Sequence, residues 1–464
     1  MTSLADPLSA PPRAALSTGA LLGFSFGMVG DRIFRDAPAL LLLIFMTSAL
    51  GVPPAMAGTA IFVPKILIMF VDPVVGNLSD RLQTRWGRRV PLMFAGAVLA
   101  SLSMLLFFHA PRMQTPALEA VYMSGLIFLG FSGYALYSVP YLTMATELAS
   151  GASERRRIMS WRVMLMAVGL AVSAFAPALV QVVGGGVQGY MAMSWLYAGT
   201  CLVTMMSTVV AAARGHRLAP HVVNDTPAGS LVTQFRVVAA NRPYLRLLAL
   251  CFAQKLGEGV GYGSFAYFVI YVVHQPLSSI GLVVLATVAG QLLAQPAWLW
   301  AGRRWSGPAL YSVGVLGWCL NLLLWLAMRG QSPLWLIPLG LEGGVAAGGF
   351  LMVTLAMLSD VLAADRLRTG IDRDGIYIGV WSAMEKFGFA MGALVVGVVL
   401  GLFGFAASTD GAATAQAPLA VFGIGFTYCG VNMVIYLASI VVVYRSARSR
   451  TPLPGGQAAP QPAP

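Results

Sequence analysis

Charged side chains lie inside the long apolar segments of this sequence, where they could bind an ion or a polar solute. Only 10% of the 464 residues are charged, and all of the lysines, Lys65, Lys255 and Lys386, fall in such segments. A charge in the interior of a membrane costs several kcal/mol unless it is paired or faces water. Each of these residues is therefore a candidate site residue.

The first apolar segment carries two acidic and two basic residues at helical spacing. Asp31 and Arg35 are four residues apart, as are Arg32 and Asp36, so both pairs could neutralise one another along one helix. In one interpretation this quartet only stabilises a helix bundle. In the other, Asp31 and Arg35 line a cavity and exchange partners when a substrate binds.

The second apolar segment combines a lysine with an acid. Lys65 and Asp72 are seven residues apart, which places them two turns apart on one helix face. A single carboxylate suits sodium poorly, because a hard cation prefers several oxygen ligands, whereas a desolvated carboxylate can exchange a proton. We predict that Asp72 couples an ion and that Lys65 binds substrate. A fixed ion pair between them is the structural alternative.

The second half of the sequence has its own buried charges. Lys255 and Glu258 are near neighbours, and Glu342 lies in an apolar segment without a nearby basic residue. We predict that Lys255 binds substrate and that Glu342 is a second ion-coupling residue, with a hydrogen-bonded structural acid as the alternative. Adjacent helical residues point about 100° apart, so Glu385 and Lys386 cannot both face the centre of one cavity.

The fourth and fifth apolar segments supply further candidates for substrate binding. Tyr137 and Tyr141 combine a ring with a polar tip, which could stack on a sugar ring or an apolar scaffold. Ordinary packing is the alternative for both. Arg162, early in the fifth segment, is another candidate, and its alternative is an interfacial residue that extends its guanidinium to water.

The composition predicts an all-α membrane protein. Hydrophobic residues make up 58% of the sequence, and apolar stretches of about 20 residues, enough to cross a bilayer as a helix, recur along it. We expect twelve transmembrane helices in two six-helix bundles. The predicted parts are, in order, a cytoplasmic N-terminal segment (1–16), the N-terminal bundle (17–214), a cytoplasmic central loop (215–243), the C-terminal bundle (244–446) and a disordered tail (447–464).

Charge placement predicts the orientation in the membrane. Most of the 29 Lys and Arg residues fall on one side if the N-terminus is cytoplasmic, and basic residues near span ends are retained on that side. Only Arg112 and Arg329 fall in the outer loops. The net charge of +12 is therefore a topology signal and does not indicate a nucleic-acid partner. We expect both termini in the cytoplasm.

Short basic loops on the cytoplasmic side predict a gate. One runs from Asp80 to Pro91, and Gly302–Gly307 occupies the corresponding place in the second half. Repeated halves with corresponding loops are typical of transporters that rock two bundles around a site at mid-membrane. We expect ion pairs that close this side when the cavity faces outward, formed by Asp80, Arg81, Arg88, Arg89, Glu147 and Glu154.

Three motifs in register with the apolar segments resemble the glycoside-pentoside-hexuronide cation symporters, a melibiose-permease-like family of the major facilitator superfamily. They are the stretch after Asp72, the stretch from Val139 to Arg162, and the stretch from Ser359 to Lys386. The resemblance implies a twelve-helix carrier that works by alternating access and moves a sugar or glycoside with sodium or a proton. It also matches Asp72, Arg162 and Lys386 to residues of the family's motifs. On this ground we place Lys386 in the cavity as a substrate-binding residue and Glu385 against a neighbouring helix.

The chain departs from this family at three positions. Sugar carriers of the family commonly have acids near Ile68 and Ser138 and a tryptophan near Leu142. The missing acid at Ile68 favours a proton over sodium as the coupling cation.

We therefore expect a secondary active transporter of the bacterial inner membrane, and not an enzyme, that moves a sugar, glycoside or related small molecule. It would act as a monomer in the lipid bilayer, with a coupling cation but without a cofactor or metal. The alternatives are a lipid or amphiphile transporter of the same family and a non-transporting membrane assembly factor of the same superfamily.

Overall fold

The computed structural model describes residues 18–448 except for 83, 148–151, 217–237, 240, 370–373, 410 and 412–413. Every regular element of these residues is helical, as the composition predicts. In chain order the elements are α1 (Thr18–Ser25), α2 (Gly27–Ser48), α3 (Pro54–Arg81), α4 (Val90–Phe107), α5 (Pro116–Glu147), α6 (Ala152–Ala174), α7 (Ala176–Val182), α8 (Gly186–His216), α10 (Arg242–Tyr267), η1 (Phe268–Val272), α11 (Ser279–Gly302), α12 (Gly307–Leu326), η2 (Pro333–Trp335), α13 (Leu336–Thr369), α14 (Asp374–Leu402), α15 (Pro418–Gly425), η3 (Phe426–Val431) and α16 (Asn432–Arg448).

Local sequence signals set where several helices begin. Pro54, Pro116 and Pro418 occupy the first helical position, where the backbone N–H that proline lacks has no partner within the helix. Asn241 caps α10, because its side-chain oxygen accepts a hydrogen bond from the backbone N–H of Tyr244 at 3.1 Å. The helix boundaries thus follow ordinary capping chemistry.

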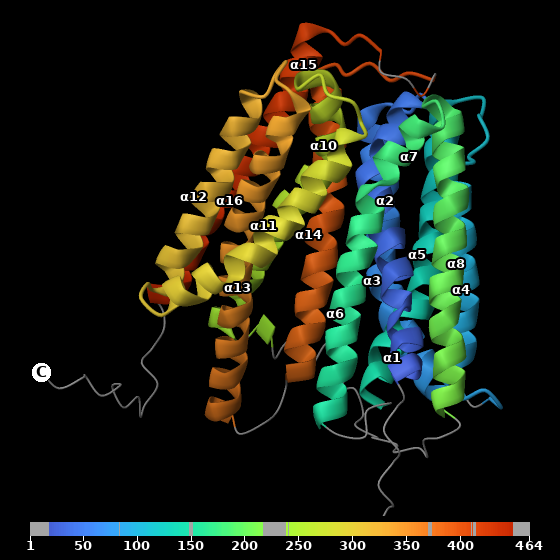
Figure 1. Ribbon diagram of the computed structural model, residues 1–464, viewed down its shortest axis with the longest axis vertical. Helices are drawn as coiled ribbons and strands as arrows, with labels where there is room; N and C mark the ends of the chain where they lie inside the picture. Colours follow the sequence, from blue (N-terminus) through green and yellow to red (C-terminus); the bar gives the residue numbers. More distant parts are fainter. Residues whose placement is uncertain are drawn as a thin grey trace, which may run out of the picture.

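The helices form two groups that stand side by side (Figure 1). Helices α1–α8 make the N-terminal group, in which α4 packs on α5 and α8, and α2 packs on α6 and α8. Helices α10–α16 make the C-terminal group, in which α13 packs on α11 and α12, and α10 packs on α14 and α16. This arrangement agrees with two predicted bundles, although their exact boundaries stay a prediction.

Ten helical segments of the described residues are long and apolar enough to cross a membrane, by length and composition. Helices α2 and α10 are not among the ten, and both carry charged residues near their middle. Nearly all of α2 is buried by other helices, so its charges are shielded from lipid. The predicted count of twelve spans requires α2 and α10 to cross as well, and it stays a prediction.

The two groups meet chiefly along α3 and α14. Their backbones touch at two glycines: a Cβ added at Gly397 would lie 3.0 Å from the Cα of Gly58, and one added at Gly58 would lie 2.6 Å from the carbonyl oxygen of Ala393. Small residues permit this close approach between membrane helices. A second contact joins α2 to α10, where the hydroxyls of Thr47 and Tyr267 are hydrogen-bonded at 2.7 Å.

A connecting segment of the C-terminal group closes over the end of α2. The backbone N–H groups of Ser408 and Gly411 donate to the carbonyl oxygens of Thr47 and Ser48, respectively, each at 2.8 Å. Arg112 of the N-terminal group donates to the backbone of the same segment. This end of the molecule is therefore sealed between the two groups.

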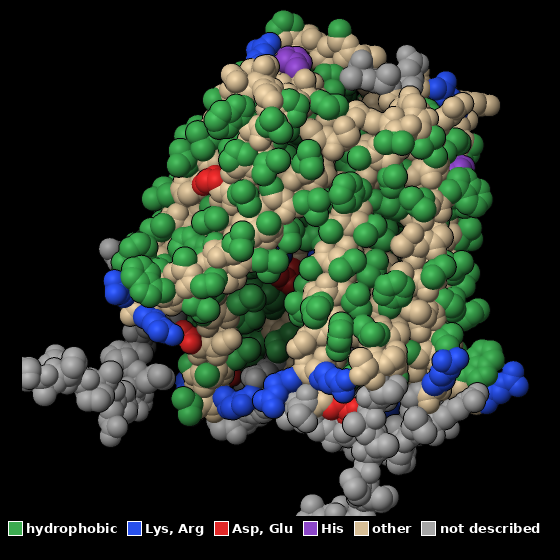
Figure 2. Space-filling model, in the orientation of Figure 1, with side chains coloured by type: hydrophobic (Ala, Val, Ile, Leu, Met, Phe, Trp, Pro, Cys, Tyr) green, Lys and Arg blue, Asp and Glu red, His purple; other side chains and the backbone are tan. Residues whose placement is uncertain are grey.

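The opposite end is hollowed. Figure 2 shows a recess between the two groups that opens toward the end where Lys and Arg side chains gather. Under the positive-inside rule this basic end is cytoplasmic. The recess then faces inward, although the orientation of the termini stays a prediction.

We predict that Gly397→Val pushes α14 away from α3, because the new side chain meets the backbone of Gly58. Overpacking of this kind costs about 1–3 kcal/mol, so the melting temperature of the purified protein should fall. Gly199→Val is the matched control, since a Cβ at Gly199 meets nothing within 4 Å. Equal melting temperatures for the two variants would contradict the predicted contact.

Candidate binding site between the helix groups

Helix α2 has one face that the other helices leave partly exposed, and we call its residues Arg32, Arg35 and Ala39 the α2 stripe. All residues of Gly27–Ser48 are buried except Arg32, Arg35 and Ala39. Spacings of three and four residues place these side chains on one face of the helix. Helices of both groups contact α2, and Glu258 of α10 acts electrostatically on Arg35, so this stripe lies near the boundary between the groups.

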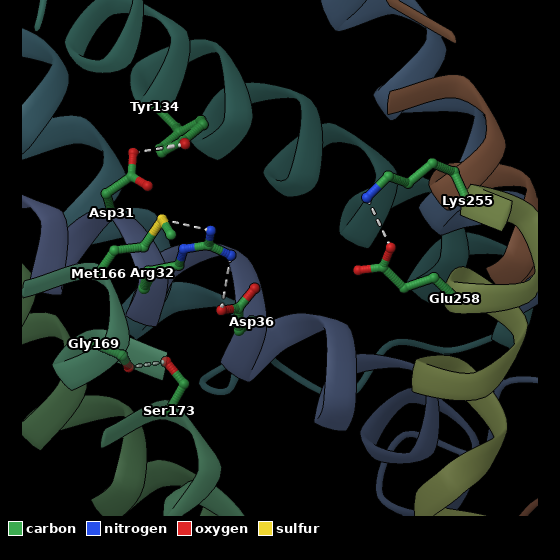
Figure 3. A network of polar contacts seen from close by, with 9 residues as sticks. All are labelled: Asp31, Arg32, Asp36, Tyr134, Met166, Gly169, Ser173, Lys255 and Glu258. Atoms are coloured by element: carbon green, nitrogen blue, oxygen red, sulfur yellow. Dashed lines mark hydrogen bonds and ion pairs between the residues drawn. The ribbon is translucent and has the colours of Figure 1, made fainter. Parts of the chain in front are cut away.

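Three charged residues of α2 find partners in the N-terminal group (Figure 3). Asp31 accepts a hydrogen bond from the hydroxyl of Tyr134 on α5 at 2.7 Å. Arg32 pairs with Asp36 at 3.7 Å and donates to the sulfur of Met166 on α6 at 2.8 Å. The ion pair between Arg32 and Asp36 that the spacing suggests is therefore confirmed.

Arg35 is the one exposed residue of α2. Among the described residues, no hydrogen-bond acceptor or carboxylate within 4.0 Å holds it, so the ion pair with Asp31 that the spacing allows does not form here. The carboxylates of Asp31, Asp36 and Glu258 act on it from a greater distance. This cation is therefore exposed and has no direct partner among the described residues.

Lys255 on α10 connects two acids of the C-terminal group. Its Nζ lies 2.8 Å from Glu258 on the same helix and 3.6 Å from Glu385 on α14. Glu385 thus meets a neighbouring helix, as predicted. Figure 3 shows Lys255 and Glu258 on the opposite side of the view from Arg32 and Asp36. Glu258 acts electrostatically on Arg35 and Asp36, so the charged clusters of the two groups lie near one another.

An ion pair joins the two groups directly. Lys386 on α14 donates to Asp72 on α3. The structural alternative, an ion pair between Lys65 and Asp72, does not form. Seven residues separate these two by about 10 Å along the helix, and the Asp72 carboxylate is paired with Lys386 instead. Lys65 instead places Nζ 5.2 Å from the ring centroid of Phe131 on α5 and 5.6 Å from that of Phe389 on α14. Lys65 therefore also lies at the boundary between the groups.

Three other predicted substrate residues pack inside the N-terminal group. Tyr137 and Tyr141 are buried, and the Tyr141 hydroxyl donates to the carbonyl oxygen of Phe24 at 3.1 Å. Arg162 is also buried, with its guanidinium 4.3 Å from the centroid of the Tyr141 ring. This placement favours packing for the two tyrosines and differs from the interfacial alternative for Arg162. Substrate contact by these three residues stays a prediction.

Aromatic residues that were not among the predicted set lie beside the charged clusters. Tyr262 follows Glu258 by one helical turn, and its ring lies 5.6 Å from that of Phe389. Tyr134, which holds Asp31, stacks on Phe34 with ring centroids 5.3 Å apart. For Tyr262, the signal in the sequence was the helical spacing from Glu258.

Glu342 lies away from this cluster. It accepts a hydrogen bond from the side-chain amide of Asn321 at 2.6 Å, and both residues belong to the C-terminal group, on α13 and α12. This contact agrees with the alternative of a hydrogen-bonded structural acid. The ion-coupling role predicted for Glu342 is untested, and we favour the structural alternative for this residue.

The predicted gate is described in part. Asp80 and Arg89 form an ion pair at 3.3 Å between the end of α3 and the start of α4, so this pair lies within the N-terminal group. The side chain of Glu147 lies outside the described residues. The predicted pairs of Arg81, Arg88, Glu147 and Glu154 stay predictions.

Comparison with known proteins identifies the class of molecule. The profile of the family described as MFS/sugar transport protein matches residues 23–447. The chain belongs to this family. Its membership confirms the resemblance drawn from the three motifs and makes the protein a multi-pass membrane transporter of the major facilitator superfamily, not an enzyme.

Individual relatives of this transporter are distant but match along most of their length. The putative glycoside/cation symporter YagG of Escherichia coli (strain K12) is 24% identical, over 91% of this chain and 90% of the relative. The glucuronide carrier protein homolog of the same strain is 24% identical over 92% of each. A solved structure of a bacterial homologue of the human lysosomal transporter Spinster, inward-facing and unoccupied, has a TM-score of 0.66 at 12% identity, covering 92% of this chain and 96% of that one. The structural likeness concerns the fold alone.

We predict that exchanging the charges of Asp72 and Lys386 restores part of the stability that each single change removes. Asp72→Lys or Lys386→Asp alone places like charges together at the boundary between the groups. The expected loss is about 1–2 kcal/mol for each, moderated because Lys386 is half exposed. Melting temperatures of the wild type, both single variants and the double variant measure the coupling. Strictly additive losses would contradict a direct pair.

We also predict that Lys255→Met destabilises the protein, because Glu258 and Glu385 lose their common cation. The expected loss is about 1–2 kcal/mol, since the cluster is partly exposed. Adding Glu385→Gln should recover part of the lost melting temperature. Lys65→Met is the control, because Lys65 contacts no carboxylate among the described residues and Glu385→Gln should not rescue it. Equal rescue of both would sink this assignment.

Proposed function

We propose that this transporter is a secondary active carrier that moves a sugar, glycoside or related organic solute across the bacterial inner membrane together with a proton. The observation that carries the proposal is the pair of Asp72 and Lys386, which bridges the two helix groups. Sugar-type solutes are supported by family membership and by relatives named as glycoside and glucuronide carriers.

The bridging pair couples a proton to movement in this proposal. While Asp72 is ionised, its attraction to Lys386 holds α3 against α14 below their glycine contact. A proton that neutralises Asp72 removes this attraction and frees Lys386. Alternating access requires the two groups to rock relative to one another, so binding and release of the proton would bias that motion.

The surroundings of Asp72 favour a proton over sodium. A sodium ion needs several oxygen ligands, yet the partner of Asp72 among the described residues is the ammonium group of Lys386. Ile68, one turn earlier on α3, is buried and contributes no oxygen. The site is therefore better suited to exchanging a proton than to holding a metal cation.

We predict that reconstituted protein takes up glycosides when an inward proton gradient is imposed and shows no response to a sodium gradient. Asp72→Asn should abolish the dependence on the proton gradient, because the amide cannot accept the proton. Glu342→Gln is the matched comparison, and it should leave coupling intact, since Glu342 lies away from the boundary between the groups.

Three results separate this function from its alternatives. Sodium-driven uptake would overturn the choice of cation. Loss of coupling in Glu342→Gln but not in Asp72→Asn would overturn the choice of residue. Absence of uptake for a broad panel of glycosides would overturn sugar transport and direct attention to amphiphiles or to a role in membrane assembly.

A further inference from the structure

The basic turn between α11 and α12, Gly302–Gly307, has no role in the proposed function. In the sequence it is the counterpart of the gate loop that begins at Asp80, but the two loops differ in their acids. Asp80 pairs with Arg89 at 3.3 Å, whereas Gly302–Gly307 contains no acidic residue. Figure 1 places this turn on the side of the C-terminal group that lies away from the N-terminal group. The turn is therefore not a gate contact in this conformation.

Arg303 and Arg304 carry two charges that the protein does not neutralise. Both are exposed, and neither forms an ion pair or a side-chain hydrogen bond with a described residue. The Arg304 guanidinium lies 4.2 Å from the ring centroid of Trp300. The backbone of the turn is ordered, because the N–H groups of Arg304 and Trp305 donate to the carbonyl oxygen of Ala301 at 3.0 and 2.9 Å. Two cations without a partner thus stand on a fixed turn.

Two tryptophans mark the level of this turn in the membrane. The side chains of Trp300 and Trp305 are 54% and 50% exposed. Tryptophan rings collect where the lipid headgroups meet the hydrocarbon, and α11 is one of the helices long and apolar enough to cross a membrane. A long arginine side chain beside such rings keeps its alkyl part on apolar surface and its guanidinium in the headgroup layer. Arg303 and Arg304 therefore lie at the level of lipid phosphates.

We propose that Arg303 and Arg304 bind the headgroup phosphate of an anionic phospholipid, and that Trp300 and Trp305 pack against the adjoining glycerol and acyl chains. A guanidinium matches a phosphate through paired N–H donors. The cytoplasmic surface of a membrane is anionic, and the basic end of this protein is cytoplasmic under the positive-inside rule. The lipid supplies the negative charge that the turn lacks. This site is separate from the solute and from the coupling cation.

The surface beside the arginines favours a lipid over an acidic soluble protein. Exposed leucines line α11 on the membrane side of the turn, and exposed apolar residues continue on α12; they are Leu292, Leu293, Leu299, Val313 and Leu316. A phospholipid contacts both parts of this surface, because its phosphate is joined to acyl chains that lie in the hydrocarbon layer. A soluble acidic protein would contact only the charged part.

The test compares two short-chain lipids that differ in net charge. Purified protein in detergent is titrated with dioctanoyl phosphatidylglycerol or with dioctanoyl phosphatidylcholine, and the melting temperature reports binding to the folded state. We expect the anionic lipid to reach half-maximal stabilisation of the wild type at about tenfold lower concentration. Arg303→Gln and Arg304→Gln should each reduce this preference about fivefold, and the double variant should remove it.

An arginine at the other end of the molecule provides the matched control. Arg329 is also exposed and lacks an ion pair among the described residues, but it lies between α12 and η2 at the sealed end. Arg329→Gln should leave the preference unchanged. Inorganic phosphate at the same concentrations should not stabilise the wild type, because it offers no acyl chains to the exposed rings.

Each possible result supports or overturns the lipid site. Equal stabilisation of the wild type by both lipids overturns it and leaves the turn as a surface for an acidic protein. An equal loss in Arg329→Gln, or stabilisation by inorganic phosphate alone, overturns it as well. The wild type gives a further check if a glutamine variant does not fold. Raising the salt concentration from about 0.1 to about 0.5 M should weaken its preference for the anionic lipid, and an unchanged preference would contradict binding by the two arginines.

Discussion

A charge inside a membrane needs a partner, and this requirement organises the boundary between the two helix groups. Helix α2 brings four charged residues into the bundle, and away from their ends α3, α10 and α14 add Lys65, Asp72, Lys255, Glu258, Glu385 and Lys386. The structure pairs most of them with one another, either along one helix, as for Arg32 and Asp36, or between the groups, as for Asp72 and Lys386. Ion pairs therefore connect helices within each group and across the boundary.

Packing and charge divide the boundary into two zones. At the sealed end the helices touch through Gly58 and Gly397, and a connecting segment is bonded to the end of α2 by backbone hydrogen bonds. Toward the basic end, contacts give way to a recess with charged side chains around it. Close packing of small residues tolerates little change, whereas ion pairs facing water can separate at modest cost. A carrier that alternates access needs both kinds of contact.

The sequence allowed the helical fold, the family and the set of buried charges to be predicted, because hydrophobic length and the high cost of a charge in lipid are local properties. It did not reveal which charges meet. Lys65 and Asp72 share a helix face, yet the ion pair of Asp72 is formed with Lys386, more than 300 residues away. The rotation of α5 about its own axis could not be predicted either. The Tyr134 hydroxyl donates to Asp31, whereas Tyr137 is buried in the core. Partner choice depends on how helices rotate against one another, which spacing along one segment cannot define.

The central claim is that the stripe on α2 lines a cavity that the solute enters. Ala39 belongs to this stripe and Ala37 is buried on another face, while the four native cysteines are free and buried. Reaction of Ala39→Cys with a small charged thiol reagent tests the claim most directly. We predict reaction from the basic end, slowed by a transported solute, with no reaction of Ala37→Cys. Failure of Ala39→Cys to react from that end, or equal reaction at both positions, would contradict it.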